Sequence, residues 1–169
     1  MAISRRLLLC ALPAALLTGC GFHLRGNFTL PFETLCLDME ENSKFTATLS
    51  RMLRASSNVK LVSDPATAEA ILRVTKNTSS RDVLSYSTSG RAREYQLKNV
   101  ITFTVTTPDG REYLPATTLT ALRDITYDES DYLSRDDEEA MIKNEMQNDL
   151  ISQMIRRIER AKPLADKSH

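Results

Sequence analysis

Histidine is scarce in this 169-residue chain, and its scarcity limits the chemistry that the protein can perform. His23 lies near the N-terminus and His169 is the last residue, so neither position suits a preorganised catalytic site. No pair of cysteines or histidines has metal-ligand spacing. The five glycines are spread through the chain and form no phosphate-binding loop. The sequence therefore predicts a protein that is not an enzyme and that holds no metal or other cofactor.

An excess of charge of either sign is also absent. Lys+Arg and Asp+Glu both number 22, so the formal net charge is zero. Residues 1–19 contain Arg5 and Arg6 and no acid, and their removal leaves 20 basic against 22 acidic residues. This balance gives no indication of general nucleic-acid binding. The remaining 150 residues are enough for one domain with an adequate core.

The N-terminus has the pattern of a bacterial lipoprotein signal peptide. Arg5 and Arg6 provide the positive start, and residues 7–17 are apolar. This apolar stretch has the length of a secretory h-region and is too short to span a bilayer, which needs about 20 apolar residues. The segment Leu17-Thr18-Gly19-Cys20 resembles the lipobox, in which small residues precede a nucleophilic cysteine. We therefore expect residues 1–19 to be removed and Cys20 to carry N-palmitoyl and S-diacylglycerol groups.

Lipidation predicts a compartment as well as an anchor. Several acyl chains on Cys20 hold a protein firmly, whereas a single chain gives only marginal binding. Gly21 follows Cys20, and an aspartate at that position would be typical of inner-membrane retention. The expected location is the outer membrane, with the domain lipid-anchored on the periplasmic side.

The apolar pattern predicts one α+β domain over residues 32–163, after a tether at 20–31 and before a frayed tail at 164–169. We expect helices at 44–56, opened by Ser43, and from about 135 to Pro163. Strands are expected at 34–39, 59–62, from 70 to beyond 77, 80–87, 92–105 and 119–127. The predicted fold is one mixed, mostly antiparallel sheet with two helices packed on one face.

The expected core consists of one sheet face and one helical stripe. Apolar residues alternate along 95–105 with Asn99 as the only polar interruption, and Pro108-Asp109-Gly110 predicts a hairpin turn after them. Cys36 has no disulfide partner once Cys10 is removed and Cys20 is lipidated, and we expect it to be buried. The stripe on the last helix comprises Met141, Ile142, Met146, Leu150, Ile151, Met154, Ile155 and Ile158.

Two basic positions are candidates for binding an anionic ligand. Arg91 and Arg93 lie near a predicted hairpin tip, and a guanidinium group can form paired hydrogen bonds with phosphate. Arg135 directly precedes the acidic first turn of the last helix. A solvated loop accounts for the same pattern at 90–93, so both interpretations stay open there.

The segment Cys20-Gly21-Phe22-His23-Leu24-Arg25-Gly26 resembles the mature N-terminus of the LptE family, lipoproteins of the outer-membrane lipopolysaccharide translocon. The resemblance extends along most of the mature chain, including residues 92–97, 108–110 and 138–141. It implies a non-enzymatic protein that forms a plug-like complex with the LptD β-barrel, helps that barrel assemble and helps deliver lipopolysaccharide to the outer leaflet. A periplasm-facing lipoprotein that serves another envelope complex as a binding or scaffold module is the alternative.

The family resemblance also bears on the basic positions. In the family, basic residues at the hairpin tip and before the last helix are linked to lipopolysaccharide contact. Arg135 corresponds to the second position, whereas Thr88 stands nearest the first and is not basic. At the first position this chain therefore departs from the family pattern, and Arg91 or Arg93 could substitute from the same tip.

Overall fold

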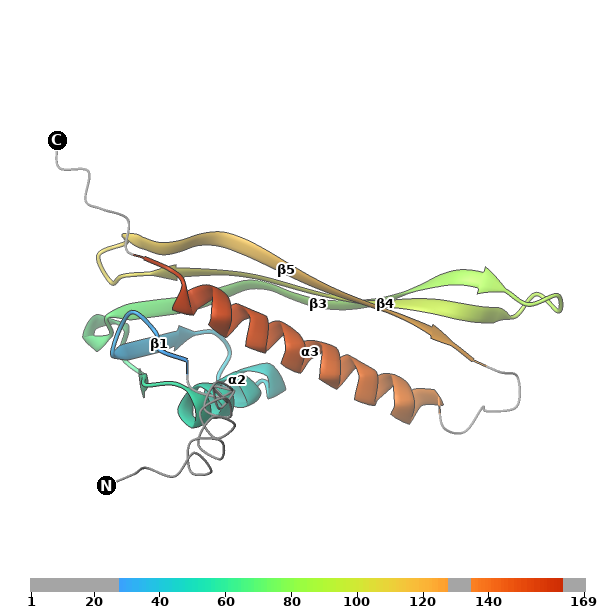
Figure 1. Cartoon of the computed structure of the whole chain (residues 1–169), viewed down its shortest axis with the longest axis horizontal. Coiled ribbons are helices and arrows are strands. Elements are labelled where there is room, and N and C mark those ends of the chain that lie inside the picture. Colours follow the sequence, from blue (N-terminus) through green and yellow to red (C-terminus); the bar gives the residue numbers. More distant parts are fainter. Residues whose placement is uncertain (1–27, 128–134, 163–169) are drawn as a thin grey trace, which may run out of the picture.

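The computed structural model describes residues 28–127 and 135–162. The predicted signal peptide, Cys20 and the C-terminal tail lie outside these residues. Along the chain the elements are β1 (Thr34–Asp38), α2 (Lys44–Ser56), β2 (Lys60–Val62), the short 3₁₀ helix η2 (Pro65–Thr67), β3 (Ala70–Tyr86), β4 (Ala92–Thr106), β5 (Glu112–Thr126) and α3 (Arg135–Glu159). One sheet has the strand order β2-β1-β3-β4-β5, and both helices lie on the same face of it (Figure 1). The predicted fold class is confirmed.

The first part of the domain is a strand–helix–strand unit. β1 pairs in parallel with both β2 and β3, and α2 connects β1 to β2. α2 begins and ends where the sequence predicts. Its first turn is capped by Ser43, whose hydroxyl accepts a hydrogen bond from the backbone N–H of Thr46 at 3.0 Å.

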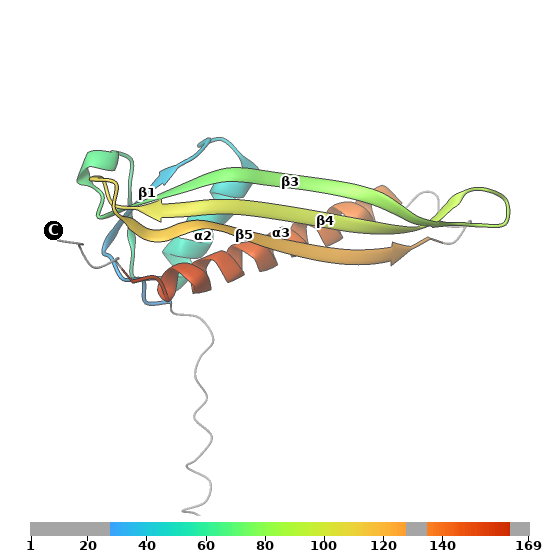
Figure 2. The ribbon, with the colours of Figure 1, turned by 90° about the horizontal axis from the view of Figure 1, so that it is seen from above.

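The second part is a long antiparallel meander of β3, β4 and β5 (Figure 2). Where two strands were expected, at 70–77 and at 80–87, the structure has the single strand β3, which is 17 residues long. Residues 75–82 of this strand are polar and exposed, so its middle lacks the alternation of apolar and polar residues that predicts a strand. Pairing with β4 continues through them, and the register between the two strands shifts at Val74/Lys76, Val83/Ser85 and Ser85/Tyr86, as at β-bulges.

Two tight turns join the three long strands. In each, a backbone N–H bonds to a carbonyl four residues later, from Ser87 to Arg91 at 2.7 Å and from Thr107 to Arg111 at 2.8 Å. The predicted turn at 108–110 is thus confirmed. Its Gly110 has φ +87°, a conformation that favours glycine.

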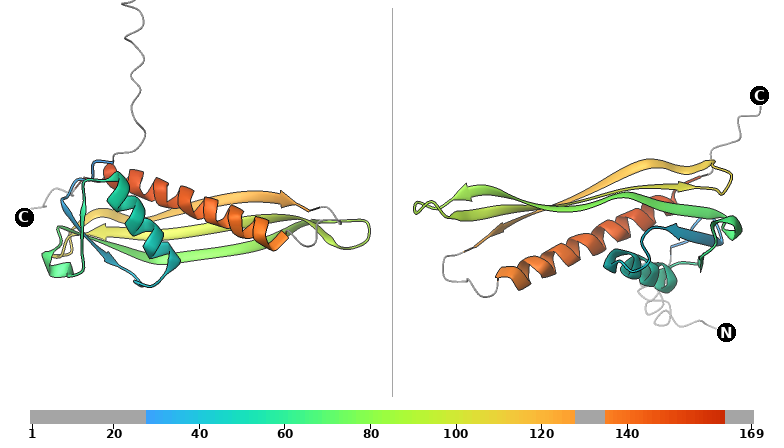
Figure 3. Two further views of the ribbon diagram at one scale, coloured as in Figure 1. Left: turned by 90° about the horizontal axis from the view of Figure 1, so that it is seen from below. Right: turned by 180° about the vertical axis from the view of Figure 1, so that it is seen from behind.

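The core lies between the sheet and the two helices. α3 crosses β4 and β5 diagonally and α2 lies beside its C-terminal half (Figure 3). Fully or almost fully buried side chains of the two layers include Leu97, Ile101, Phe103, Val105, Leu150, Ile151, Met154, Ile155 and Ile158. Asn99 is buried among them and its amide donates to the carbonyl of Lys143 at 3.3 Å, which ties the sheet to α3.

Met141 departs from the predicted helical stripe. Its side chain is 57% exposed, and Ile142 is only partly buried. Met141 follows the buried Glu139 by two residues, about 200° around the helix, and therefore points away from the sheet; the fully buried part of the apolar stripe begins at Met146. Cys36, by contrast, is 3% exposed as predicted, and burial, followed by the charges of Asp38 and Asp64, raises the pKa of its thiol.

The described chain enters the domain beside the ends of both helices. Phe28 forms an isolated bridge with Ser57, the backbone N–H of Thr29 donates to Glu159 Oε1 at 3.1 Å, and Leu30 is buried. The β3–β4 hairpin lies at the opposite end of the sheet (Figure 1). Neither of the two described α-helices combines the length and apolarity that a bilayer-spanning helix needs.

Candidate functional site

The hairpin end of the molecule carries the basic residues singled out in the sequence. Arg91 closes the β3–β4 turn and Arg93 follows on β4. Both side chains are exposed, and neither forms an ion pair with a described residue. The structure describes Arg135 as the first residue of α3, and this end of the helix faces the same end of the sheet as the hairpin (Figure 1). The three positions thus lie toward the same end of the fold, Arg91 and Arg93 on the hairpin and Arg135 at the start of α3.

A charged cluster beneath the start of α3 was not predicted. Glu139 is buried against the sheet, where its carboxylate binds Arg81 Nη1 of β3 at 2.7 Å and Lys143 Nζ of α3 at 2.6 Å. The Arg81 guanidinium also lies 5.0 Å from the centre of the Tyr95 ring, and Tyr95 packs edge-on against Tyr127. These contacts hold the first turns of α3 on the hairpin half of the sheet.

The electrostatics of this cluster favour an ionised carboxylate. Burial by itself raises the pKa of Glu139, but hydrogen bonds and charges from Lys143 and Arg81 outweigh it, and the net pKa is lowered. The i,i+4 spacing of Glu139 and Lys143 was visible in the sequence. The link to Arg81 was not, because it depends on the register that places Arg81 opposite Leu97 on the helix-facing side of the sheet.

The other face of the sheet is covered by no described element (Figure 2). The register aligns short hydroxyl side chains on this outer face: Thr78, Ser80, Thr102, Thr104, Thr118 and Thr120. Thr102 and Thr118 lie side by side, with their hydroxyl oxygens 2.9 Å apart. Val100 and the half-exposed Leu122 are apolar members of the same face. The outer face is therefore predominantly polar and rich in hydrogen-bonding groups.

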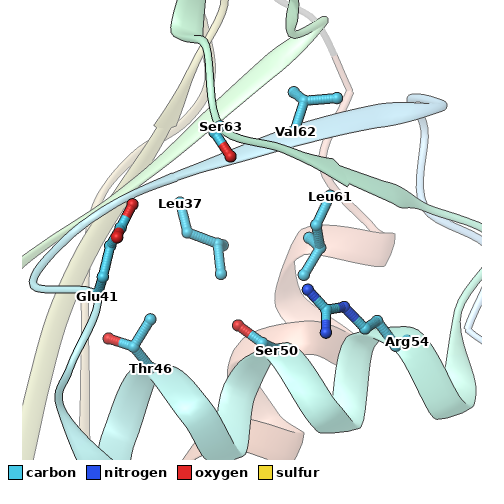
Figure 4. Close-up of a pocket in the computed structure, with 8 residues that line it drawn as sticks. All are labelled: Leu37, Glu41, Thr46, Ser50, Arg54, Leu61, Val62 and Ser63. Carbon is cyan, nitrogen blue, oxygen red and sulfur yellow. The ribbon is translucent and has the colours of Figure 1, made fainter.

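A cavity of about 210 Å³ lies between α2 and the strands β1 and β2 (Figure 4). From α2, the Arg54 guanidinium and the Ser50 hydroxyl point into it, and Glu41 stands on the opposite side (Figure 4). Leu37 and Leu61 supply apolar walls. The cavity thus offers one cation, one anion and an apolar surface, but no arrangement of groups for acid–base or nucleophilic catalysis.

A second hollow of about 260 Å³ lies where the last turns of α3 cross β5. It is lined by Leu119, Gln153, Arg156, Arg157 and Arg160, and we call it the arginine groove. The sequence showed these arginines only as cations near the end of a helix. Their convergence with a β5 side chain into one groove depends on how α3 crosses the sheet.

Metal-ligating side chains do not gather in the part of the chain that the structure describes: it holds no cluster of three or more His, Cys, Asp or Glu residues placed to bind an ion. His23 and His169 lie outside that part.

The family model and the sequence relatives agree on the family. A family model described as lipopolysaccharide-assembly, LptE, matches residues 32–158. The LPS-assembly lipoprotein LptE of Pectobacterium atrosepticum is 31% identical over 156 residues, which cover 89% of this chain and 83% of the relative. Its namesake from Photorhabdus laumondii is 27% identical with the same coverage.

The fold is similar to that of solved lipoproteins. Lipoprotein B from Nitrosomonas europaea has a TM-score of 0.70 at 26% identity, covering 82% of this chain and 90% of that one. A minor lipoprotein from Acinetobacter baumannii has a TM-score of 0.65 at 25% identity, covering 80% and 98%. The match of the family model over three quarters of the chain carries the assignment, and the chain belongs to the LptE family of lipopolysaccharide-assembly lipoproteins.

Proposed function

We propose that this protein is a non-enzymatic outer-membrane lipoprotein that forms a plug-like complex with the LptD β-barrel. In this role it assists assembly of the barrel and helps deliver lipopolysaccharide to the outer leaflet. Membership of the family supports the assembly role. The observation that carries the plug itself is the uncovered, hydroxyl-rich outer face of the sheet.

A polar outer face suits the inside of a barrel. The lumen of an outer-membrane barrel is polar, whereas its lipid-facing surface is apolar. A protein enclosed in such a lumen gains from side chains that hydrogen-bond with the wall, and the threonines of the outer face provide them along all three long strands. An apolar face of the same size would instead favour lipid or an apolar partner.

The proposed anchor fixes which end of the plug stays near the membrane surface that holds the lipid. Phe28 follows Cys20 by eight residues, which span at most about 29 Å when fully extended. The helix ends beside Phe28 must therefore stay close to the anchor, and the β3–β4 hairpin can extend away from it. Arg91, Arg93 and Arg135 then lie at the far end, where we propose that they contact lipopolysaccharide phosphates.

Affinity isolation of the lipidated chain from outer membranes tests the complex. We expect the LptD barrel to co-purify, and we expect depletion of the chain to lower both folded barrel and surface lipopolysaccharide. Thr120→Arg, in the exposed middle of the outer face, should reduce barrel recovery because it adds bulk and charge to the packed surface. Ala47→Arg, a matched change at an exposed position of α2, is the control. Recovery of a free monomer, with normal surface lipopolysaccharide after depletion, would exclude the proposal.

A further inference from the structure

The arginine groove brings together three arginines at the C-terminal end of α3. Arg156, Arg157 and Arg160 line it together with Gln153 from the same helix. All four side chains are exposed, and none of the three arginines forms an ion pair with a described residue. Arg160 follows Arg156 by four residues and Arg157 by three, and like charges at these helical spacings repel each other, so the arrangement favours an anion from outside.

The helix dipole explains only part of this arrangement. The negative end of α3 stabilises cations in its last turn. It does not require them to converge with a residue of another element around a hollow of about 260 Å³. Leu119 of β5 adds an apolar side chain to the groove, and Gln153 adds an amide that can donate and accept. The groove thus combines a polycationic wall with a small apolar contact.

The position of the groove indicates the source of the anion. The backbone N–H of Thr29 donates to Glu159, in the turn of α3 that lies between Arg156 and Arg160. The first described residues, Phe28 and Thr29, therefore lie beside the last turns of α3, which also line the groove. With at most about 29 Å of chain between Phe28 and the lipidated cysteine, this end of the domain stays near the bilayer surface.

We propose that the arginine groove binds the phosphate of an anionic phospholipid headgroup in the membrane that holds the anchor. Guanidinium groups form paired hydrogen bonds with phosphate oxygens, and basic residues close to a bilayer are attracted to anionic lipids. Gln153 can hydrogen-bond with the glycerol oxygens, and Leu119 can contact the first methylene groups. Together with the acyl anchor, this second contact fixes the orientation of the domain on the membrane. The inference rests on the proposed function in one respect only, the lipid anchor at Cys20.

Native mass spectrometry of the full lipidated chain in nonionic detergent tests the groove. Phosphatidylglycerol is added as the probe and phosphatidylcholine as the zwitterionic comparison. We expect one phosphatidylglycerol to be retained, and we expect Arg156→Gln with Arg157→Gln and Arg160→Gln to weaken this retention at least tenfold. The control removes three exposed cations elsewhere, by Arg51→Gln with Lys76→Gln and Lys98→Gln, and should retain the lipid as the parent chain does.

A second variant separates binding from folding. Gln153→Glu keeps the three arginines and changes one exposed residue, and the added negative charge should weaken phosphatidylglycerol retention several-fold with an unchanged melting temperature. Equal retention by the parent chain and by both groove variants would overturn the proposal. So would binding of inorganic phosphate without phosphatidylglycerol, or a preference for lipopolysaccharide through the same arginines. Because the chain is assayed alone, failure here is distinguishable from failure to recover the barrel.

Discussion

Replacement of Glu139 by Gln removes a buried negative charge while keeping the size of the side chain. The carboxylate is 11% exposed and binds two cations, whose side chains are 47% exposed in Arg81 and 35% exposed in Lys143. Hydrogen bonds to charged groups contribute about 1.5–3 kcal/mol, but partly exposed partners regain water when they lose their anion. We therefore expect a loss of about 1–2 kcal/mol at pH 7, or about 3–8 °C in Tm for a domain of this size.

The pH dependence of this loss identifies its cause. The pKa of Glu139 is lowered in the fold from its ordinary value of 4.5. Its ionised form therefore contributes stability above pH 4.5, and that contribution disappears as the pH falls through the lower folded value. Thermal unfolding followed by circular dichroism from pH 7 to pH 3 should show the parent and Glu139→Gln curves converging in acid. Glu138→Gln, which changes an exposed neighbour, is the control, and its melting temperature should stay close to that of the parent. A Glu139→Gln variant that melts like the parent at pH 7, or a difference that persists unchanged at pH 3, would refute the electrostatic account.

Other predictions concern the core, the free thiol and the hairpin end. Leu150→Ala should cost about 2–5 kcal/mol in urea unfolding because Leu150 is fully buried, whereas Met141→Ala should stay within about 0.5 kcal/mol. The Cys36 thiol should resist alkylation in the folded protein and react on unfolding; fast labelling of the native chain would contradict its burial. Combined substitution of Arg91, Arg93 and Arg135 by alanine should weaken lipopolysaccharide binding without changing Tm. Unchanged binding would show that these arginines do not contact lipopolysaccharide.

The sequence predicts those helices, strands and turns whose formation depends on residues close together in the chain. Ser43 caps α2 through a hydrogen bond within its own first turn, and a Pro-Asp-Gly turn needs only its own residues to reverse the chain. The buried face of β4 was visible in the alternation along 95–105, including the polar exception at Asn99. Each of these features depends on neighbours in sequence, so one sequence suffices to show it.

Features that depend on distant contacts were not predictable. The middle of β3 is polar on both faces and is held in the sheet by β4, so its own residues do not reveal a 17-residue strand. Met141 was assigned to the helical stripe, but it lies two residues after Glu139, about 200° around the helix, and so points away from the face of α3 that Glu139 and Met146 turn toward the sheet. The arginine groove likewise exists only because α3 crosses β5 near Leu119.

Photo-crosslinking in living cells from the middle of the outer face tests the central claim most directly. A photoreactive amino acid at Thr120, which is exposed and lies beside Val100 in the sheet, reports what covers this face in the envelope. The plug model predicts that the LptD barrel is the main product, with loss of the crosslink when the barrel is depleted. Capture of a different envelope protein, with no barrel product, would contradict it and favour a scaffold role in another complex.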